Sequence, residues 1–297
     1  MEFQRRHSSH CPVCGSMFRN LRHEWLFRCD KCGLLSSTLR PAIPKERNET
    51  ILDEGTRLAG LYEVRKRSNA VILDRLTKLF GDTERSLLDV GSGHGLLLRD
   101  AAARGYRIEG LEPDANVVAS ARTITSAPVR QGFFPDAIGK DERFDGIIFN
   151  DVLEHIPALE NAIEASYQLL RPGGILVLNC PDQKGAFYRL SDWLDRVGFT
   201  SPFRRMWQYD LPSPHLWYFS ANHLVELGRK VGFKQLDIVR MAPVSASGLW
   251  HRITYVRGQS RLLNHVTFLG AMALLPILGI LPRDTMIIFF QRPKTQA

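Results

Sequence analysis

The stretch from Leu87 to Gly95, which reads LLDVGSGHG, constrains the fold of this chain more than any other. Ahead of the glycines, Ser86 to Val90 form a short apolar run, which predicts a buried strand. After them, Leu96 to Ala103 contain good helix formers throughout, which predicts a helix. Glycines between a strand and a helix let the backbone pass close to a ligand. The pattern therefore predicts a loop that binds a nucleotide-type cofactor.

The spacing of these glycines distinguishes two classes of cofactor. Dinucleotides are bound by G-x-G-x-x-G, in which the third glycine allows close packing of the helix. Here the order is Asp89-x-Gly91-x-Gly93-x-Gly95. It resembles the cofactor loop of class I S-adenosylmethionine-dependent methyltransferases, which wraps the aminocarboxypropyl end of the cofactor. The resemblance implies that Asp89, Gly91, Gly93 and Gly95 bind the methionine end.

A second strand is predicted from Tyr106 to Leu111, and it ends at Glu112. This acid follows Gly93 by about 20 residues, the spacing expected for a carboxylate that binds ribose hydroxyls. A carboxylate accepts from two neighbouring hydroxyls at once, and the carboxyl end of a strand faces the ligand crevice of an open α/β sheet. Glu112 is therefore the candidate ribose acid, and a solvated turn is the alternative interpretation.

Two later runs carry the resemblance further. Residues 144–157 read FDGIIFNDVLEHIP, an apolar strand with a polar exit, and residues 169–182 read LLRPGGILVLNCPD. Both resemble the ubiquinone-biosynthesis-like branch of class I methyltransferases. A third segment, His215 to Ser220, matches the H-x-x-x-F-S pattern of the same branch, so the resemblance extends from Ser86 nearly to the carboxyl end.

The resemblance implies an α/β fold with a doubly wound, seven-stranded, mostly parallel, Rossmann-like sheet. Its last two strands would be Lys234 to Met241 and Thr285 to Arg292, neighbours in the sheet with the final one antiparallel. It also places Asn150, after the fourth strand, at the cofactor. After the third strand, where many relatives have an acid, this chain reads Gly132-Phe133-Phe134, and we expect Phe133 to stack on adenine instead.

Four of the five cysteines form the pairs Cys11-x-x-Cys14 and Cys29-x-x-Cys32, each followed by a glycine. Such turns place two thiolates together, and two facing turns complete a tetrahedral site suited to Zn²⁺. Four thiolates leave no open position, so we expect a structural zinc ion. Redox or iron–sulfur chemistry is the alternative. His7, His10 and His23 are less favoured ligands, and the fifth cysteine, Cys180, is interpreted as a small buried hydrophobe.

The chain divides into three parts by composition. Residues 1–40 are too few to fold on apolar burial alone, so metal binding would stabilise a zinc-ribbon-like module. Residues 41–55 contain two prolines and charged residues, which predict a linker. Residues 56–297 would form the methyltransferase domain and begin with a helix over 56–80.

The net charge of +8 favours an anionic partner such as RNA, a phosphorylated substrate or an acidic membrane surface, although a basic solvated surface is equally compatible. No signal peptide is visible at the first residues, which indicates a cytoplasmic location.

Residues 185–218 are dense in aromatic side chains mixed with arginines, which is compatible with a lid over a flat, anionic or amphiphilic ligand, or over bases stacked beside phosphates. Most individual aromatics there are expected to belong to the core. Residues 245–284 would be an insertion between the last two strands, and Leu262 to Pro282 carry no formal charge. A span of about 20 residues is long enough to cross a bilayer. We reject a span because it would separate two strands that must pair.

The polar residues and the proline in Leu262 to Pro282 fit a helix, a break and a second helix. Such a pair, framed by arginines, is typical of contact with the cytoplasmic face of a membrane. A buried helical pair and a dimer interface are the alternatives. Membrane contact would favour a lipid, a quinone or a lipid-linked glycan as the acceptor.

Methyl transfer needs alignment and exclusion of water more than it needs catalytic groups. If the acceptor is a hydroxyl, a base would help, and His155, His215 and Asp151 are the candidates. The sequence thus predicts an S-adenosylmethionine-dependent enzyme, with O-methylation of a small-molecule or lipid-like acceptor as the leading function. An RNA methyltransferase with a zinc module and a non-catalytic cofactor-binding protein are the alternatives.

Overall fold

The computed structural model describes residues 10–41, 54–81, 84–241, 249–254, 260–278 and 281–294. Most of the predicted linker, residues 42–53, lies outside the described residues. A seven-stranded sheet forms the centre, in the order β10-β11-β8-β7-β4-β5-β6. Its strands are β4 (Ser86–Val90), β5 (Arg107–Glu112), β6 (Val129–Gln131), β7 (Phe144–Asn150), β8 (Leu170–Pro181), β10 (Lys234–Met241) and β11 (Thr285–Gln291).

Strand direction in this sheet confirms the expected doubly wound topology. β4 pairs in parallel with both β5 and β7, and β7 pairs in parallel with β8. β11 is antiparallel to both of its neighbours, β8 and β10. The last two strands are therefore neighbours, although the whole insertion separates them in sequence. Because four central strands run in parallel, their carboxyl ends meet at one edge of the sheet.

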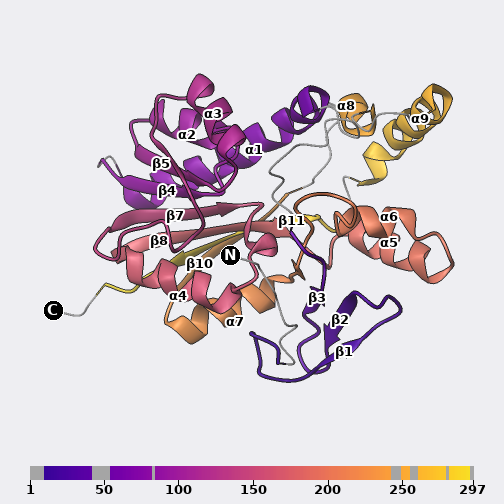
Figure 1. Ribbon diagram of the computed structural model, residues 1–297, viewed down its shortest axis with the longest axis horizontal. Helices are drawn as coiled ribbons and strands as arrows, with labels where there is room; N and C mark the ends of the chain where they lie inside the picture. Colours follow the sequence, from indigo (N-terminus) through magenta and orange to yellow (C-terminus); the bar gives the residue numbers. More distant parts are fainter. Residues whose placement is uncertain are drawn as a thin grey trace.

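Helices cover both faces of the sheet (Figure 1). On one face, α1 (Glu54–Phe80), α2 (Leu96–Ala102) and α3 (Ala115–Ile124) bury apolar residues such as Ile72, Leu97 and Val118. On the other, α4 (Leu159–Leu169) and α7 (Ala221–Val231) bury Ile163 and Leu227, among others. Strands covered on both faces explain why the β4 and β7 sequences are almost continuously apolar.

A second, four-stranded sheet contains the cysteine-rich segment. β1 (Phe18–Asn20), β2 (Leu26–Cys29) and β3 (Leu35–Ser37) form antiparallel pairs. The fourth strand, β9 (Trp217–Tyr218), comes from the far end of the aromatic-rich segment and pairs with β3. The ribbon therefore shares a sheet with a strand that lies far from it in the sequence.

The aromatic-rich segment folds as α5 (Ala186–Arg196), α6 (Ser201–Met206) and β9. Two of its large side chains, Phe203 and Trp207, are fully buried and pack with Leu26 and Leu35 of the ribbon. This cluster confirms that many of the aromatics are core residues. Trp193 and Phe199 are exposed, at 57% and 67%. The lid role of the segment stays a prediction.

The insertion contains α8 (Leu249–Thr254) and α9 (Arg261–Leu278), and α9 packs against α8, which packs against α1. The predicted break within Leu262 to Pro282 is wrong for residues 261–278, because α9 is continuous there. Its polar residues bond along the helix: Asn264 N donates to Ser260 O at 3.0 Å, and a ring nitrogen of His265 lies 2.7 Å from Arg261 O. Among the described residues, no helix is long and apolar enough to cross a bilayer.

Candidate functional site

The glycine loop lies between β4 and α2, as predicted. Gly91, Gly93 and Gly95 all have positive φ, at 69°, 53° and 78°. A Cβ on Gly91 would lie 2.6 Å from the side chain of Val152, whereas a Cβ on Gly93 would meet nothing within 4 Å. The first glycine is therefore required by packing, and the second borders open space. This geometry suits a backbone that approaches a ligand at Gly93.

Glu112 ends β5 at the same edge and contacts the loop directly. Its Oε2 accepts from Gly93 N at 3.1 Å, and its Oε1 accepts from Asp114 N at 3.0 Å. Burial raises the pKa of Glu112, while the two backbone donors oppose this shift. The carboxylate is thus placed beside the loop, which is where a ribose acid is expected.

Asn150 ends β7 and belongs to a chain of amides. Its Oδ1 accepts from Asn179 Nδ2 at 2.7 Å, and its Nδ2 donates to Asn69 Oδ1 at 3.1 Å. Asn69 in turn donates to Asp100 Oδ2 at 3.3 Å. Asn69 and Asn179 were not singled out from the sequence, because only the tertiary fold brings them to Asn150, although Asn179 lies within the LLRPGGILVLNCPD run.

Phe133 follows β6 and is 45% exposed at the same edge. The neighbouring Phe134 packs edge-on against Phe149 of β7, with ring centroids 5.3 Å apart. Phe134 is therefore the packed aromatic of the pair, and Phe133 stays the candidate for stacking on adenine.

Two histidines meet beyond the end of β7. The rings of His155 and His215 have centroids 4.8 Å apart, although they come from η1 (Leu153–His155) and from the segment before β9. A ring nitrogen of His155, Nδ1, lies 2.9 Å from Pro214 O, and His215 Nε2 lies 2.9 Å from Gln208 Nε2. The structure thus brings both predicted histidines into one cluster.

Glu154 joins this cluster and was missed by sequence reasoning. It is 1% exposed, and its carboxyl oxygens lack a partner with good hydrogen-bond geometry among the described residues, although the thiol of Cys180 lies beside them. His215 Nδ1 is buried in the same way, with the backbone of Met206 beside the ring. Ligand atoms of Glu154, His155 and His215 lie within 4.8 Å of one another, a set that can hold a metal ion or share a proton. In the sequence, the one indication of its role was its position between two candidate residues, Asp151 and His155.

The pKa values of Glu154 and His215 are shifted in opposite directions. Burial, and then the charge of Asp151, raise the pKa of Glu154 well above its ordinary value. Burial, and then His155, hold the pKa of His215 well below its ordinary value. Both side chains therefore favour their neutral forms. Asp151 itself is exposed and has a positive φ of 57°, a conformation that non-glycine residues adopt rarely and chiefly at functional sites.

The four paired cysteines converge in the ribbon. Cys11 and Cys32 have sulfurs 3.5 Å apart, those of Cys14 and Cys29 are 3.3 Å apart, and all four lie within 4.8 Å of one another. Sulfurs around a tetrahedral zinc ion, each at about 2.3 Å from the metal, are separated by similar distances. The donor set therefore fits Zn²⁺.

Histidines of this region serve other contacts. His23 Nε2 lies 2.9 Å from both carboxyl oxygens of Asp195 in α5 and is not in the cysteine cluster. His223 accepts from Ser220 N through Nδ1, so its Nε2 donates to Cys32 O at 2.9 Å. The cysteine turn is thereby held against the first turn of α7. His7 lies outside the described residues.

Comparisons with known proteins agree with this geometry. The model of a methyltransferase domain family matches residues 64–238. The chain belongs to this family. A ubiquinone biosynthesis O-methyltransferase of Alkalilimnicola ehrlichii is 31% identical over 118 residues, which are 37% of this chain and 48% of that protein. The mitochondrial ubiquinone biosynthesis O-methyltransferase of Bos taurus is 26% identical over 177 residues, 56% of this chain and 45% of that protein.

The chain thus spans about half the length of the relatives it matches. Among solved structures, a phosphoethanolamine N-methyltransferase 2 of Haemonchus contortus, in complex with S-adenosylhomocysteine, shares the fold with a TM-score of 0.51. It is 20% identical, and the match covers 77% of this chain and 53% of that one. The recognition of a class I S-adenosylmethionine-dependent methyltransferase is confirmed.

Asp89 provides a test of whether the site fits this cofactor. The side chain is 2% exposed, and its Oδ1 has no hydrogen-bond partner among the described residues. Burial, and then the nearby Glu112, raise the pKa of Asp89 to about 8. A buried acceptor without a partner is costly unless a ligand satisfies it. The ammonium group of S-adenosylmethionine is a donor of the required charge, so the residues fit the cofactor.

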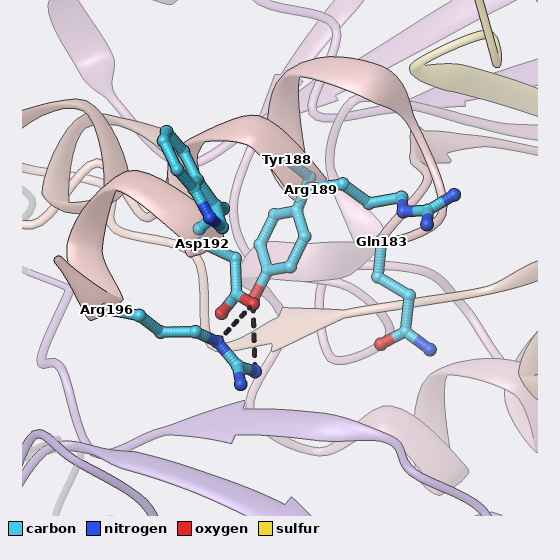
Figure 2. A pocket seen from close by; sticks show the side chains of 6 residues that line it. Gln183, Tyr188, Arg189, Asp192 and Arg196 are labelled. Carbon is cyan, nitrogen blue, oxygen red and sulfur yellow. Dashed lines mark hydrogen bonds and ion pairs between the residues drawn. The ribbon is translucent and has the colours of Figure 1, made fainter.

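A cavity of about 330 Å³ lies along α5 (Figure 2). Asp192 and Arg196 form an ion pair in its wall, and Trp193 adds an exposed ring. Gln183, which follows β8, faces the same cavity. A pocket with aromatic and arginine side chains is compatible with the amphiphilic acceptor expected from the sequence.

We predict that the purified protein contains one zinc ion per chain. Cys14→Ser removes one thiolate and should lower the zinc content and the thermal stability, because metal binding and folding of the ribbon are coupled. Metal analysis and thermal denaturation measure both effects. Cys180→Ala, which removes the cysteine outside the cluster, should keep the zinc. Equal zinc content in the two variants would contradict the assignment.

We predict that cofactor affinity depends on the ionisation of Asp89. Since its pKa is raised to about 8, the free protein holds a proton there at neutral pH. An ammonium group favours the carboxylate, so affinity for S-adenosylmethionine should rise from pH 6 towards pH 8. Calorimetry should show proton release in wild type, and roughly tenfold weaker binding without this pH dependence in Asp89→Asn. Glu109→Gln, also in this sheet but paired with Arg130, is the control and should bind like wild type.

Proposed function

We propose that this protein transfers a methyl group from S-adenosylmethionine to a hydroxyl oxygen of a small organic acceptor. The observation that carries the proposal is the pair of buried acids, Asp89 and Glu112, beside the glycine loop. Asp89 has an unsatisfied oxygen and Glu112 is bonded to the loop backbone, as a cofactor with an ammonium group and a ribose requires. A protein that had lost cofactor binding would have no need of such a costly arrangement.

S-adenosylmethionine supplies a methyl group on a sulfonium, so the leaving group is neutral. The residues of the chain align the cofactor and exclude water. Asp89 and the backbone around Gly93 bind the methionine end, and Glu112 binds the ribose hydroxyls. Phe133 covers the adenine, and Asn150 is held in place by its amide neighbours. Alignment of this kind contributes most of the rate when few catalytic groups are needed.

The proton of the acceptor hydroxyl is removed by His155 in this proposal. Nδ1 of His155 is 2.9 Å from Pro214 O, and since a carbonyl only accepts, that bond assigns the proton to Nδ1 and makes Nε2 the basic nitrogen. His215 lies behind it, buried and neutral. His155 is only half-buried, so of the two it is the one that an acceptor can reach.

The choice of oxygen as the methylated atom is supported by the relatives, which are named as O-methyltransferases. RNA methylation is the alternative, and the net charge of +8 and the cysteine cluster of the N-terminal ribbon favour it. The acceptor is proposed to be a small or lipid-like molecule because the cavity along α5 combines the exposed Trp193 ring with arginines.

Methyl-labelled S-adenosylmethionine, incubated with the protein and a cell extract, tests this function. We expect label in the organic fraction, and His155→Gln should lower its rate of appearance roughly a hundredfold or more. His265→Gln, on the exposed part of α9, is the control and should retain the rate. Label in RNA would overturn the proposal in favour of the alternative. Label in no fraction, with normal cofactor binding, would favour a non-catalytic protein.

We further propose that α9 lies on the surface of an anionic membrane. Leu262, Val266 and Leu269 recur at helical spacing and are 76%, 60% and 66% exposed, so one face of the helix is apolar and uncovered. Arg261 begins the helix, and Arg283 follows it on the exposed surface. Exposed apolar residues flanked by cations are typical of helices that lie in the membrane interface.

Sedimentation with vesicles tests this contact. We expect the protein to bind vesicles that contain phosphatidylserine, and Leu262→Asp together with Leu269→Asp should abolish binding because two charges would enter the interface. Trp193→Asp changes an exposed apolar residue on α5 and should leave binding intact. If the double variant binds as wild type does, α9 is not the contact. If the wild type binds neutral vesicles as well as it binds vesicles with phosphatidylserine, the arginines do not contribute to membrane binding.

A further inference from the structure

A second cavity, of about 720 Å³, lies between the ribbon and the methyltransferase domain. We call it the inter-module cavity. The ribbon contributes the turns around Cys14 and Cys32, and the domain contributes residues after β8 and one side of α7. It is lined by Val13, Cys14, Arg28, Lys31, Cys32, Gly33, Gln183, Lys184, Ser220, Asn222, His223, Glu226 and Lys230.

Four cations line this cavity, from three separate segments. Arg28 and Lys31 come from the ribbon, Lys184 follows β8, and Lys230 lies in the last turn of α7. The acid in the wall is Glu226, and its two oxygens already accept from Arg229 at 2.7 and 2.9 Å. In the described part of the chain, none of the four cations is within ion-pair distance of a carboxylate, although Lys230 Nζ donates to Pro12 O at 3.1 Å.

A zinc ion bound by the four thiolates would explain the presence of some of these four cations, because the metal site itself would be negatively charged. Four thiolates around a divalent cation leave about two net negative charges, and two of the ligands, Cys14 and Cys32, line the cavity. Two cations are enough to balance them. Lys184 lies in the wall that the methyltransferase domain contributes, opposite the ribbon. Of the four cations, it is the one that the charge of the metal site explains least.

The neutral groups of the cavity are also arranged for a ligand. Gln183 lines both this cavity and the cavity along α5, and its Oε1 is buried without a hydrogen-bond partner in the described structure, so it can accept from the hydroxyl of a ligand in either. His223 is fixed between Ser220 N and Cys32 O, and burial lowers its pKa. The positive charge of the cavity therefore comes from arginine and lysine and persists at neutral pH.

We propose that the inter-module cavity binds a phosphorylated small molecule through its phosphate or pyrophosphate group. Arginine binds such oxygens with two parallel hydrogen bonds, and lysines add point charges. Several cations that converge from three segments suit a multiply charged anion better than a single carboxylate. A hydroxyl beside the phosphate would bond to Gln183. The proposal goes beyond methyl transfer and does not depend on it.

Calorimetry with inorganic pyrophosphate and the zinc-loaded full-length protein tests the proposal. We expect saturable binding that weakens at least tenfold in Lys184→Gln and in Arg28→Gln, because each removes a charged hydrogen bond. Lys78→Gln, on the opposite face of the sheet, is the matched control and should bind as wild type does. Zinc content and circular dichroism establish that the variants fold.

The outcomes separate the possible sources of the phosphate. Vesicles with phosphatidic acid, bound through Lys184 and displaced by pyrophosphate, would place the phosphate on a lipid. Pyrophosphate binding through Lys184, with vesicle binding unaffected by that variant, would place it on a soluble molecule. No saturable binding, or equal binding by Lys184→Gln and Lys78→Gln, would overturn the proposal. So would a single-stranded RNA that binds through these residues far more tightly than pyrophosphate.

Discussion

The parallel pairing of β5, β4, β7 and β8 is the constraint on which the rest of the site depends. Parallel register brings Asp89 level with Gly110 on one side and Ile148 on the other, and it sets Asn150 opposite Asn179. Every polar residue that follows these strands therefore arrives at one edge. The glycine loop and the loop that carries Glu154 and His155 lie at the same edge for that reason, although they are far apart in the chain.

The second constraint is the link between the ribbon and the histidine cluster. Ser37 N donates to Leu216 O at 2.9 Å, and Ser37 Oγ donates to His215 O at 2.6 Å. Leu216 N then donates to Glu154 O at 2.8 Å. The backbone that carries His215 is held between the ribbon and the loop that follows β7. A structural metal in the ribbon would thus act on the geometry of the site without touching an acceptor.

The features that could be predicted from the sequence are those coded by neighbours in the chain. The strand Ser86–Val90, the glycine loop and Glu112 depend on local periodicity and spacing, and the structure has them where they were expected. Glu154 and Asn69 acquire their roles only through tertiary contacts, since one is buried beside His215 and the other bonds to Asn150. The break expected in α9 was wrong because the ring of His265 bonds to Arg261 O within the helix and Pro276 lies in its last turn.

Strand β9 has a consequence for how the chain folds as it is made. Residues 35–37 form the third strand of the ribbon, and during synthesis they emerge long before Trp217 and Tyr218, their partners in the sheet. Until then, β3 has an unpaired edge, and Leu26 and Leu35 lack the aromatic side chains that cover them. Exposed strand edges and apolar surface are prone to pair with other chains. The stretch of synthesis between residue 37 and residue 218 is therefore the period in which the ribbon is most exposed to wrong pairing.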